Sequence, residues 1–176
     1  WGGGDVILAR CDQHSSPMTA MAHALAVRLR CLGLRQRQIY ARLSKRFPSL
    51  SGVIRNALSS LLCELHDGDD TSISLPNQPL TILESAFAHM AERRALVLIL
   101  ENYESDPVVD AVLRRLMSSS LRFTLVLSRE RAPTGQRANP FESAVHYTLA
   151  PLSLSEQAVF IRHALNVRPD LAHRLA

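Results

Sequence analysis

The stretch ALVLILENYES, residues 95–105, decides how the fold is read. Six apolar residues stand in a row and are followed at once by Glu101 and Asn102. An apolar run without alternation predicts a strand buried on both faces, as in a parallel sheet sandwiched between helices. The polar end leaves two interpretations open. Either a buried strand simply runs into a loop, or the strand ends at a phosphate-handling site.

Strand and helix patterns alternate on both sides of this stretch. DVILAR (5–10) and RFTLVLS (122–128) predict two further buried strands, and VHYTL (145–149) predicts a shorter one. Apolar residues at helical spacing predict helices within the segments 17–32, 39–47, 51–65, 80–94, 107–116 and 153–165. Helix-start signals are Ser16-Pro17, Asp106-Pro107 and the capping-box pair Ser153 and Glu156. The alternation predicts a parallel sheet with right-handed crossovers.

The length of 176 residues suits one compact α/β domain, and the first residue, Trp1, suggests a fragment of a longer chain. Three cysteines lie far apart and outside CxxC pairs, which is typical of reduced thiols in an intracellular protein. No apolar run approaches the ~18 residues that span a bilayer, and no secretory leader is recognised. We expect an intracellular protein with no membrane partner, in the nucleus if eukaryotic and otherwise in the cytoplasm.

Positive charge gathers in one part of the chain. No Asp or Glu occurs from Gln13 to Cys63, whereas that segment holds many basic residues, namely Arg28, Arg30, Arg35, Arg37, Arg42, Lys45, Arg46 and Arg55. A long basic stretch without counter-charge can bind polyanions, so the stretch 28–55 is a candidate contact for nucleic acid. It can equally be a solvated helical face or a surface that docks on an acidic partner.

The polar strand ends can be compared with what phosphate chemistry needs, which is a phosphate cradle, a magnesium site and a group that activates water. Glu101 can reach a metal ion, but Asn102 cannot take a proton from water. Ser128 and Arg129 end the next strand, either as a plain strand exit or as a phosphate-sensing pair. The cradle motif GxxxxGK[ST] does not occur. We therefore expect no tight triphosphate binding by this chain alone and assign neither a catalytic residue nor a metal site.

Four segments together resemble, in order and spacing, the AAA+ and STAND superfamily of P-loop ATPases. They are residues 5–25, 95–107, 121–130 and 145–165. In that superfamily these would be the second strand with its helix, the Walker B strand, the sensor 1 strand, and the last core strand leading into the helical lid. The resemblance implies a three-layer parallel α/β core at 1–150, which lacks the first strand and the P-loop, and the start of a helical lid at 151–176.

Two branches of the superfamily are similar to this chain. LuxR-type STAND regulators share the patterns Asp106-Pro107, Ser128-Arg129 and Pro151-Leu152-Ser153. Origin recognition complex subunits often have a Walker B region like Glu101-Asn102-Tyr103-Glu104. An upstream glycine-rich loop ending in GK[ST] would restore the ATPase reading. A downstream winged helix would favour the origin-recognition branch, and a helix-turn-helix the regulator branch.

The departures from the superfamily pattern imply that the chain does not hydrolyse ATP by itself, because Glu101 replaces the metal aspartate and Asn102 the catalytic glutamate. If ATP and Mg²⁺ bind, with a P-loop supplied upstream, Glu101, Asn102, Ser128 and Arg129 would line the site. The resulting hypothesis is a non-hydrolysing structural or regulatory subunit, origin-recognition-like, in an assembly with other subunits and DNA that acts in replication initiation. The alternatives are a LuxR-type transcription regulator with nucleotide-dependent oligomerisation, and a plain protein-interaction module that never bound nucleotide.

Overall fold

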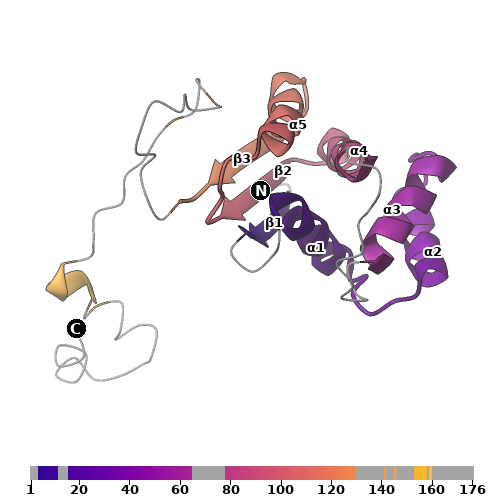
Figure 1. The fold of residues 1–176 in the computed structure, drawn as a ribbon, viewed down its shortest axis with the longest axis horizontal. Helices are drawn as coiled ribbons and strands as arrows, with labels where there is room; N and C mark the ends of the chain where they lie inside the picture. Colours follow the sequence, from indigo (N-terminus) through magenta and orange to yellow (C-terminus); the bar gives the residue numbers. More distant parts are fainter. Residues whose placement is uncertain are drawn as a thin grey trace. The chain divides into compact units, whose positions relative to one another are not determined.

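The computed structural model describes residues 4–11, 16–64, 78–129, 141, 145, 153–157 and 159. The chain divides into two compact units, Trp1–Phe141 and Glu142–Ala176. Elements of the first unit follow the order strand, four helices, strand, helix, strand (Figure 1). They are β1 (Asp5–Arg10), α1 (Pro17–Leu29), α2 (Gln36–Arg46), α3 (Gly52–Glu64), α4 (Gln78–Arg93), β2 (Leu96–Glu101), α5 (Pro107–Ser118) and β3 (Phe123–Leu127).

The three strands form one parallel sheet in the order β1-β2-β3, which confirms the predicted parallel α/β class. The 95–105 stretch supplies the central strand, β2. In the register, Ile7 lies beside Leu98, which in turn lies beside Leu125. All three strands therefore end at the same edge of the sheet, and this carboxyl edge is where the polar residues of the sequence prediction fall.

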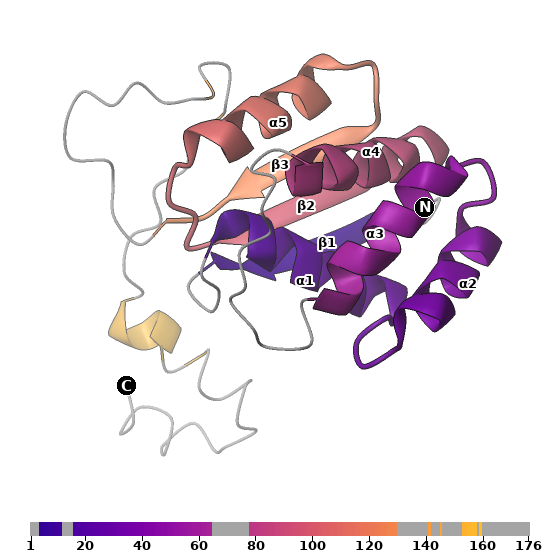
Figure 2. The same cartoon turned by 45° about the vertical axis from the view of Figure 1, so that its right-hand side comes forward.

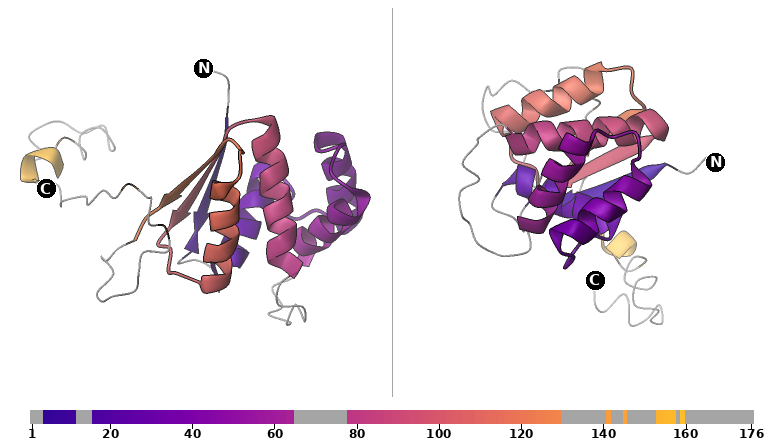
Figure 3. Two further views of the ribbon diagram at one scale, coloured as in Figure 1. Left: turned by 90° about the horizontal axis from the view of Figure 1, so that it is seen from above. Right: turned by 90° about the vertical axis from the view of Figure 1, so that its right-hand side faces the viewer.

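One face of the sheet carries the core. Along β1 and β2, buried side chains on this face alternate with more exposed side chains on the opposite face. Ile7, Leu98 and Leu100, on the buried face, are at most 1% exposed. Helices α1, α4 and α5 pack on this face, and α2 and α3 form a pair on the outer side of α1 and α4 (Figures 2 and 3). The helices thus lie on the same side of the sheet, which appears nearly edge-on in the left view of Figure 3.

The second face of the sheet differs from the expected three-layer arrangement. Within the described part of the chain no helix covers it, and Val6 and Leu8 are 55% and 46% exposed. The reason is topological: β1, β2 and β3 step across the sheet in one direction, and right-handed crossovers then place their helices on one face. A helical layer on the second face stays a prediction.

The predicted start of α1 is confirmed, but the helix ends earlier than predicted. Ser16 Oγ accepts a hydrogen bond from Thr19 N at 3.1 Å, and Pro17 opens the helix. The last helical residue is Leu29, because Arg30 adopts a left-handed conformation with φ of 56°. Hydrogen bonds from the Arg30 and Cys31 amides to carbonyls of the last turn close the helix before Gly33.

The described residues of the second unit contain the predicted capping box. Ser153 N donates to Glu156 Oε2 at 2.8 Å, and Glu156 N donates back to Ser153 Oγ at 3.4 Å. The Ser153 hydroxyl also donates to Glu156 Oε2, at 2.6 Å, and this hydrogen bond, together with the one from Ser153 N, lowers the pKa of the Glu156 carboxyl. Apart from Val145, the strand predicted at 145–149 lies outside the described residues, as does most of the helix predicted at 153–165.

Candidate functional site

The four residues predicted to line a nucleotide site meet at the carboxyl edge of the sheet. Glu101 is the last residue of β2, and Asn102 follows it. Ser128 and Arg129 directly follow β3. The Asn102 amide donates to Ser128 Oγ at 3.4 Å, and the Tyr103 amide donates to the Ser128 carbonyl at 3.0 Å. These contacts bring the exits of β2 and β3 together.

The carboxylate of Glu101 is held by the protein's own arginine. Arg10, the last residue of β1, lies beside Glu101 in the register, and its Nε donates to Glu101 Oε2 at 3.0 Å. The two side chains are 54% and 39% exposed, so solvent screens the pair and its contribution to stability is small. A metal ion at Glu101 would have to compete with this guanidinium for the carboxylate.

Asn102 adopts the left-handed backbone conformation of the turn after β2. Its φ is 52°, in the left-handed region that asparagine adopts more readily than most residues. Its amide nitrogen meets Ser128, and its side-chain amide offers no group that can take a proton from water. The residue after Glu101 therefore supports the turn that follows β2 and is not a second carboxylate.

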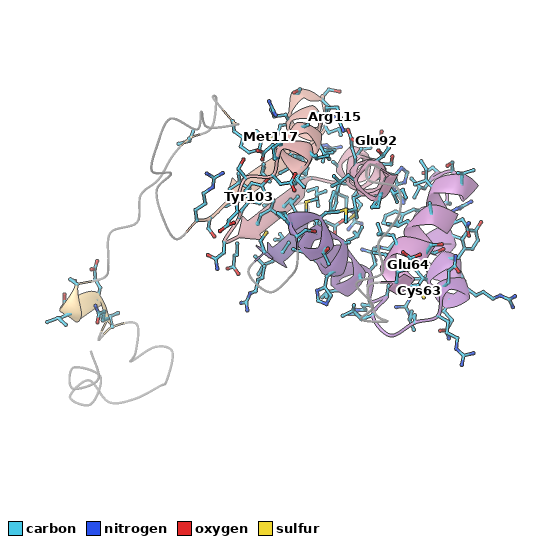
Figure 4. The ribbon with its side chains drawn as sticks, in the orientation of Figure 1. Cys63, Glu64, Glu92, Tyr103, Arg115 and Met117 are labelled. Atoms are coloured by element: carbon cyan, nitrogen blue, oxygen red, sulfur yellow. The ribbon has the colours of Figure 1, made fainter. Side chains whose placement is uncertain are left out.

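Tyr103 anchors the loop behind this edge to α5. Tyr103, which Figure 4 labels, is 1% exposed. Its hydroxyl donates to Asp110 Oδ1 at 2.5 Å. Ser105 Oγ donates to the other oxygen of Asp110, also at 2.5 Å. The buried carboxylate is thus satisfied by two hydroxyl donors. Burial, together with the hydrogen bond to Asp110, raises the pKa of Tyr103.

Arg129 lies beside the ring of the same tyrosine. Its Cζ atom is 5.8 Å from the centroid of the Tyr103 ring, within the range of a cation–π contact. Arg129 is itself exposed, so its guanidinium also faces solvent. The Arg129 guanidinium therefore lies beside an aromatic ring at the carboxyl edge, and its N–H groups could donate to an anion there.

Sequence analysis assigned no role to three residues at or behind this edge, namely Arg10, Tyr103 and Asp110, although Tyr103 lies in the quoted Walker B-like pattern. Arg10 had one usable signal, because DVILAR and LVLILE have equal length and each ends in a charged residue. Asp110 stands among valines in the first turns of an amphipathic helix. An acidic residue is favourable near the amino end of any helix, so its presence there did not indicate a buried carboxylate. Across the described residues, no group of three or more His, Cys, Asp or Glu side chains can hold a metal ion.

Most of the residues predicted to contact nucleic acid are exposed, whereas Arg28 forms an ion pair with an acidic residue. The exposed group, here named the basic surface, lies on α2 and the turn before it and consists of Arg30, Arg35, Arg37, Arg42, Lys45 and Arg46. Arg28 is separate, because its Nη2 donates to Asp5 of β1. The other basic residue of the stretch, Arg55, is half-buried 5.8 Å from the Tyr40 ring centroid and serves packing between α2 and α3.

The basic surface has little internal neutralisation. The four ion pairs of the described residues are Arg10–Glu101, Arg28–Asp5, His89–Glu92 and Arg115–Glu84, and none uses a side chain of α2. One hydrogen bond lies within the basic surface, and a second joins the surface to α4. Arg42 Nη1 donates to the Arg30 carbonyl, and the Arg46 carbonyl accepts from Arg93 Nη1 at 2.8 Å. These contacts orient the surface without cancelling its charge.

Comparison of the chain with protein-family models, with curated proteins and with solved structures finds no significant match. The fold is therefore stated at its own level, as a small α/β domain with a three-stranded parallel sheet flanked by helices. Where the structure describes the chain, no helix is long and apolar enough to cross a membrane.

Proposed function

We propose that this chain is an ATPase-like domain that does not hydrolyse nucleotide and serves as a structural or regulatory part of a larger DNA-associated assembly, of the origin-recognition kind. The observation that carries the proposal is the Arg10–Glu101 pair. The carboxylate that ends the central strand is paired with an arginine of the neighbouring strand. The next position, Asn102, supports a turn rather than an attacking water.

The arrangement of the strand ends supports the resemblance to the AAA+ and STAND superfamily. The strands with Walker B-like and sensor 1-like ends are adjacent and parallel, so Glu101 and Ser128 lie at one edge. In that superfamily such an edge faces the phosphates and the metal ion. Here Asn102 N and Tyr103 N contact Ser128, and Arg129 lies beside Tyr103. On this proposal the edge derives from a nucleotide site, and its polar groups now make contacts within the domain.

Phosphate release from ATP·Mg tests the catalytic part of this proposal. We expect the wild-type chain to release no more phosphate than the Glu101→Ala variant, because no second carboxylate is available to activate water. Phosphate release that depends on Glu101 would overturn the proposal. Arg122→Gln is a matched control for a general loss of surface charge, since Arg122 is exposed and precedes β3.

Thermal unfolding with millimolar ATP·Mg separates a structural role from a regulatory one. A ligand that binds the native state raises the melting temperature. A rise that disappears in Arg129→Ala would assign nucleotide sensing to Arg129. No rise in the wild type would leave a structural role and would exclude nucleotide sensing by this chain.

A plain protein-interaction module is the second candidate function. The specific observation in its favour is the sheet face that the described helices leave uncovered, where Val6, Leu8 and Val126 are 55%, 46% and 44% exposed. Apolar residues grouped on one surface mark sites of association more often than scattered ones do.

A further inference from the structure

The helix α2, which carries most of the basic surface, stands out from the rest of the first unit. It lies at the outer edge of that unit and packs on α3 (Figures 1 and 2). Of its 11 residues only Ile39 and Leu43 are buried. Most of the circumference of α2 therefore faces outward, so the helix forms a ridge that can enter a groove of a binding partner.

The outward side of α2 is positive at both ends and small in the middle. Arg37, Ala41 and Lys45 follow one another along this side at helical spacing, and all three are exposed. Within the described part of the chain, neither the Arg37 nor the Lys45 side chain makes a hydrogen bond or an ion pair. Arg42 differs, because its Nη1 already donates to the Arg30 carbonyl. Two cations are thus free for an anionic partner, and the alanine between them lets that partner come close to the helix.

The dimensions of this side match the major groove of duplex DNA. Arg37 and Lys45 lie about 12 Å apart along the helix axis, at about 1.5 Å of rise per residue. The major groove of B-form DNA is about 12 Å wide and admits one helix. Side chains cannot read the deep, narrow major groove of duplex RNA. The spacing of the two cations therefore favours DNA as the duplex.

Arg37 is the residue of this side that is best suited to contact a base. It stands in the first turn of α2, and in helix-turn-helix proteins the amino-terminal residues of the recognition helix contact base edges. The planar guanidinium presents parallel N–H groups that match the O6 and N7 acceptors of guanine. The Lys45 ammonium has no such fork and suits a phosphate.

From these observations we propose that α2 lies in the major groove of duplex DNA, where Arg37 donates two hydrogen bonds to a guanine and Lys45 binds a phosphate. Arg37 then determines specificity, and the chain prefers duplexes with a guanine at one position. The inference rests on the proposed association with DNA and adds a groove and a base to it. It does not depend on nucleotide binding at the carboxyl edge of the sheet.

Selection from a random library of DNA duplexes tests the base preference. We expect the duplexes bound by the 176-residue chain to share a guanine at one position. Arg37→Lys keeps the charge but lacks the fork, so the same selection should lose this preference. The matched control is Gln36→Ala, because Gln36 Nε2 donates to Ser60 Oγ of α3 and does not belong to the proposed contact. A guanine preference that persists in Arg37→Lys, or that also disappears in Gln36→Ala, would overturn the proposal.

Fluorescence anisotropy with the selected duplex measures the contact in the wild-type chain. Replacing the selected G·C pair by A·T should weaken binding at least about 5-fold. Replacing the guanine by 7-deazaguanine, which lacks the N7 acceptor in the major groove, should also weaken binding. This probe leaves the protein unchanged, so its result does not depend on the folding of a variant. Unchanged affinity for the 7-deazaguanine duplex would contradict a contact in the major groove.

The outcomes separate this inference from the proposed function. Salt-dependent DNA binding without a base preference would overturn the placement of α2 in the major groove and would leave the association with DNA standing. Equal affinity for an RNA duplex of the same sequence would have the same consequence. Absence of binding to any duplex at low salt would overturn both the inference and the DNA-associated part of the proposed function.

Discussion

At the scale of single residues, Tyr103 links the carboxyl edge of the sheet to the helix that follows it. Its hydroxyl donates to buried Asp110, and its backbone amide donates to the Ser128 carbonyl. Tyr103→Phe keeps the ring but leaves the Asp110 carboxylate short of one donor. We expect a loss of about 1–3 kcal/mol in the free energy of unfolding at neutral pH, measured by urea denaturation.

Tyr40→Phe is the control for this substitution, because Tyr40 is a half-buried tyrosine on α2 that packs near Arg55. Its variant should lose much less stability than Tyr103→Phe. Equal losses would mean that the hydrogen bond to Asp110 contributes nothing specific.

The raised pKa of Tyr103 predicts a pH dependence of stability. In the unfolded chain tyrosine loses its proton near pH 10, whereas burial and Asp110 keep Tyr103 protonated in the native state beyond that pH. The unfolded state then binds fewer protons, so stability falls as pH rises above about 10. The Tyr103→Phe variant lacks this effect, and its unfolding free energy should decline less steeply between about pH 9 and 11. Parallel curves for the two proteins would contradict the assignment.

At the scale of elements, α5 begins at a cap that the sequence identifies. Asp106 Oδ1 accepts hydrogen bonds from Val108 N at 2.8 Å and Val109 N at 3.1 Å, and Pro107 occupies the first helical position. Asp106→Ala removes the acceptor and should cost about 1 kcal/mol in thermal or urea unfolding. Asp106→Asn keeps an acceptor oxygen and should cost much less. An asparagine variant as unstable as the alanine variant would assign the effect to charge rather than to capping.

Local signals explain which elements the sequence could predict. The apolar run of β2 and the caps at Ser16 and Asp106 depend on neighbouring residues, and all three are found where predicted. The end of α1 was missed because an arginine, Arg30, takes the left-handed position that a glycine usually marks. The Arg10–Glu101 pair joins residues 91 positions apart, so only the strand register could reveal it.

The strand β2 also shows why an apolar run does not tell whether helices cover one face of a sheet or both. Its unbroken LVLIL sequence predicted burial on both faces, yet Val97 and Ile99 are only half-buried within the described structure. A strand whose second face is uncovered can have the same composition as a strand that is covered on both faces. The sequence could therefore predict the apolar character of both faces, but not which segment or partner covers the second.

At the scale of the whole molecule, charge and apolar surface are separated across the first unit. The basic surface lies on α2, in the helix pair on the outer side of α1 and α4 (Figures 1 and 3). The sheet face that carries Val6, Leu8 and Val126 is the one turned away from α1, α4 and α5. A polyanion bound to the basic surface would leave that face of the sheet uncovered. The basic surface can therefore be tested by itself.

Duplex DNA binding by the basic surface should depend steeply on salt, because each phosphate contact releases counterions. Fluorescence anisotropy between about 50 and 200 mM salt gives the slope of log affinity against log salt. Arg37→Gln and Lys45→Gln, both on the exposed side of α2, should each weaken binding and reduce the magnitude of that slope by about 1.

The control is Arg122→Gln, which removes an arginine at the amino edge of the sheet and should change neither the affinity nor the slope. Binding that does not respond to salt, or equal loss in all three variants, would remove the basic surface as the DNA contact. Two other effects could also weaken DNA binding, and each can be recognised. Unfolding of a variant would shift its melting temperature, and a general effect of charge would appear in Arg122→Gln as well.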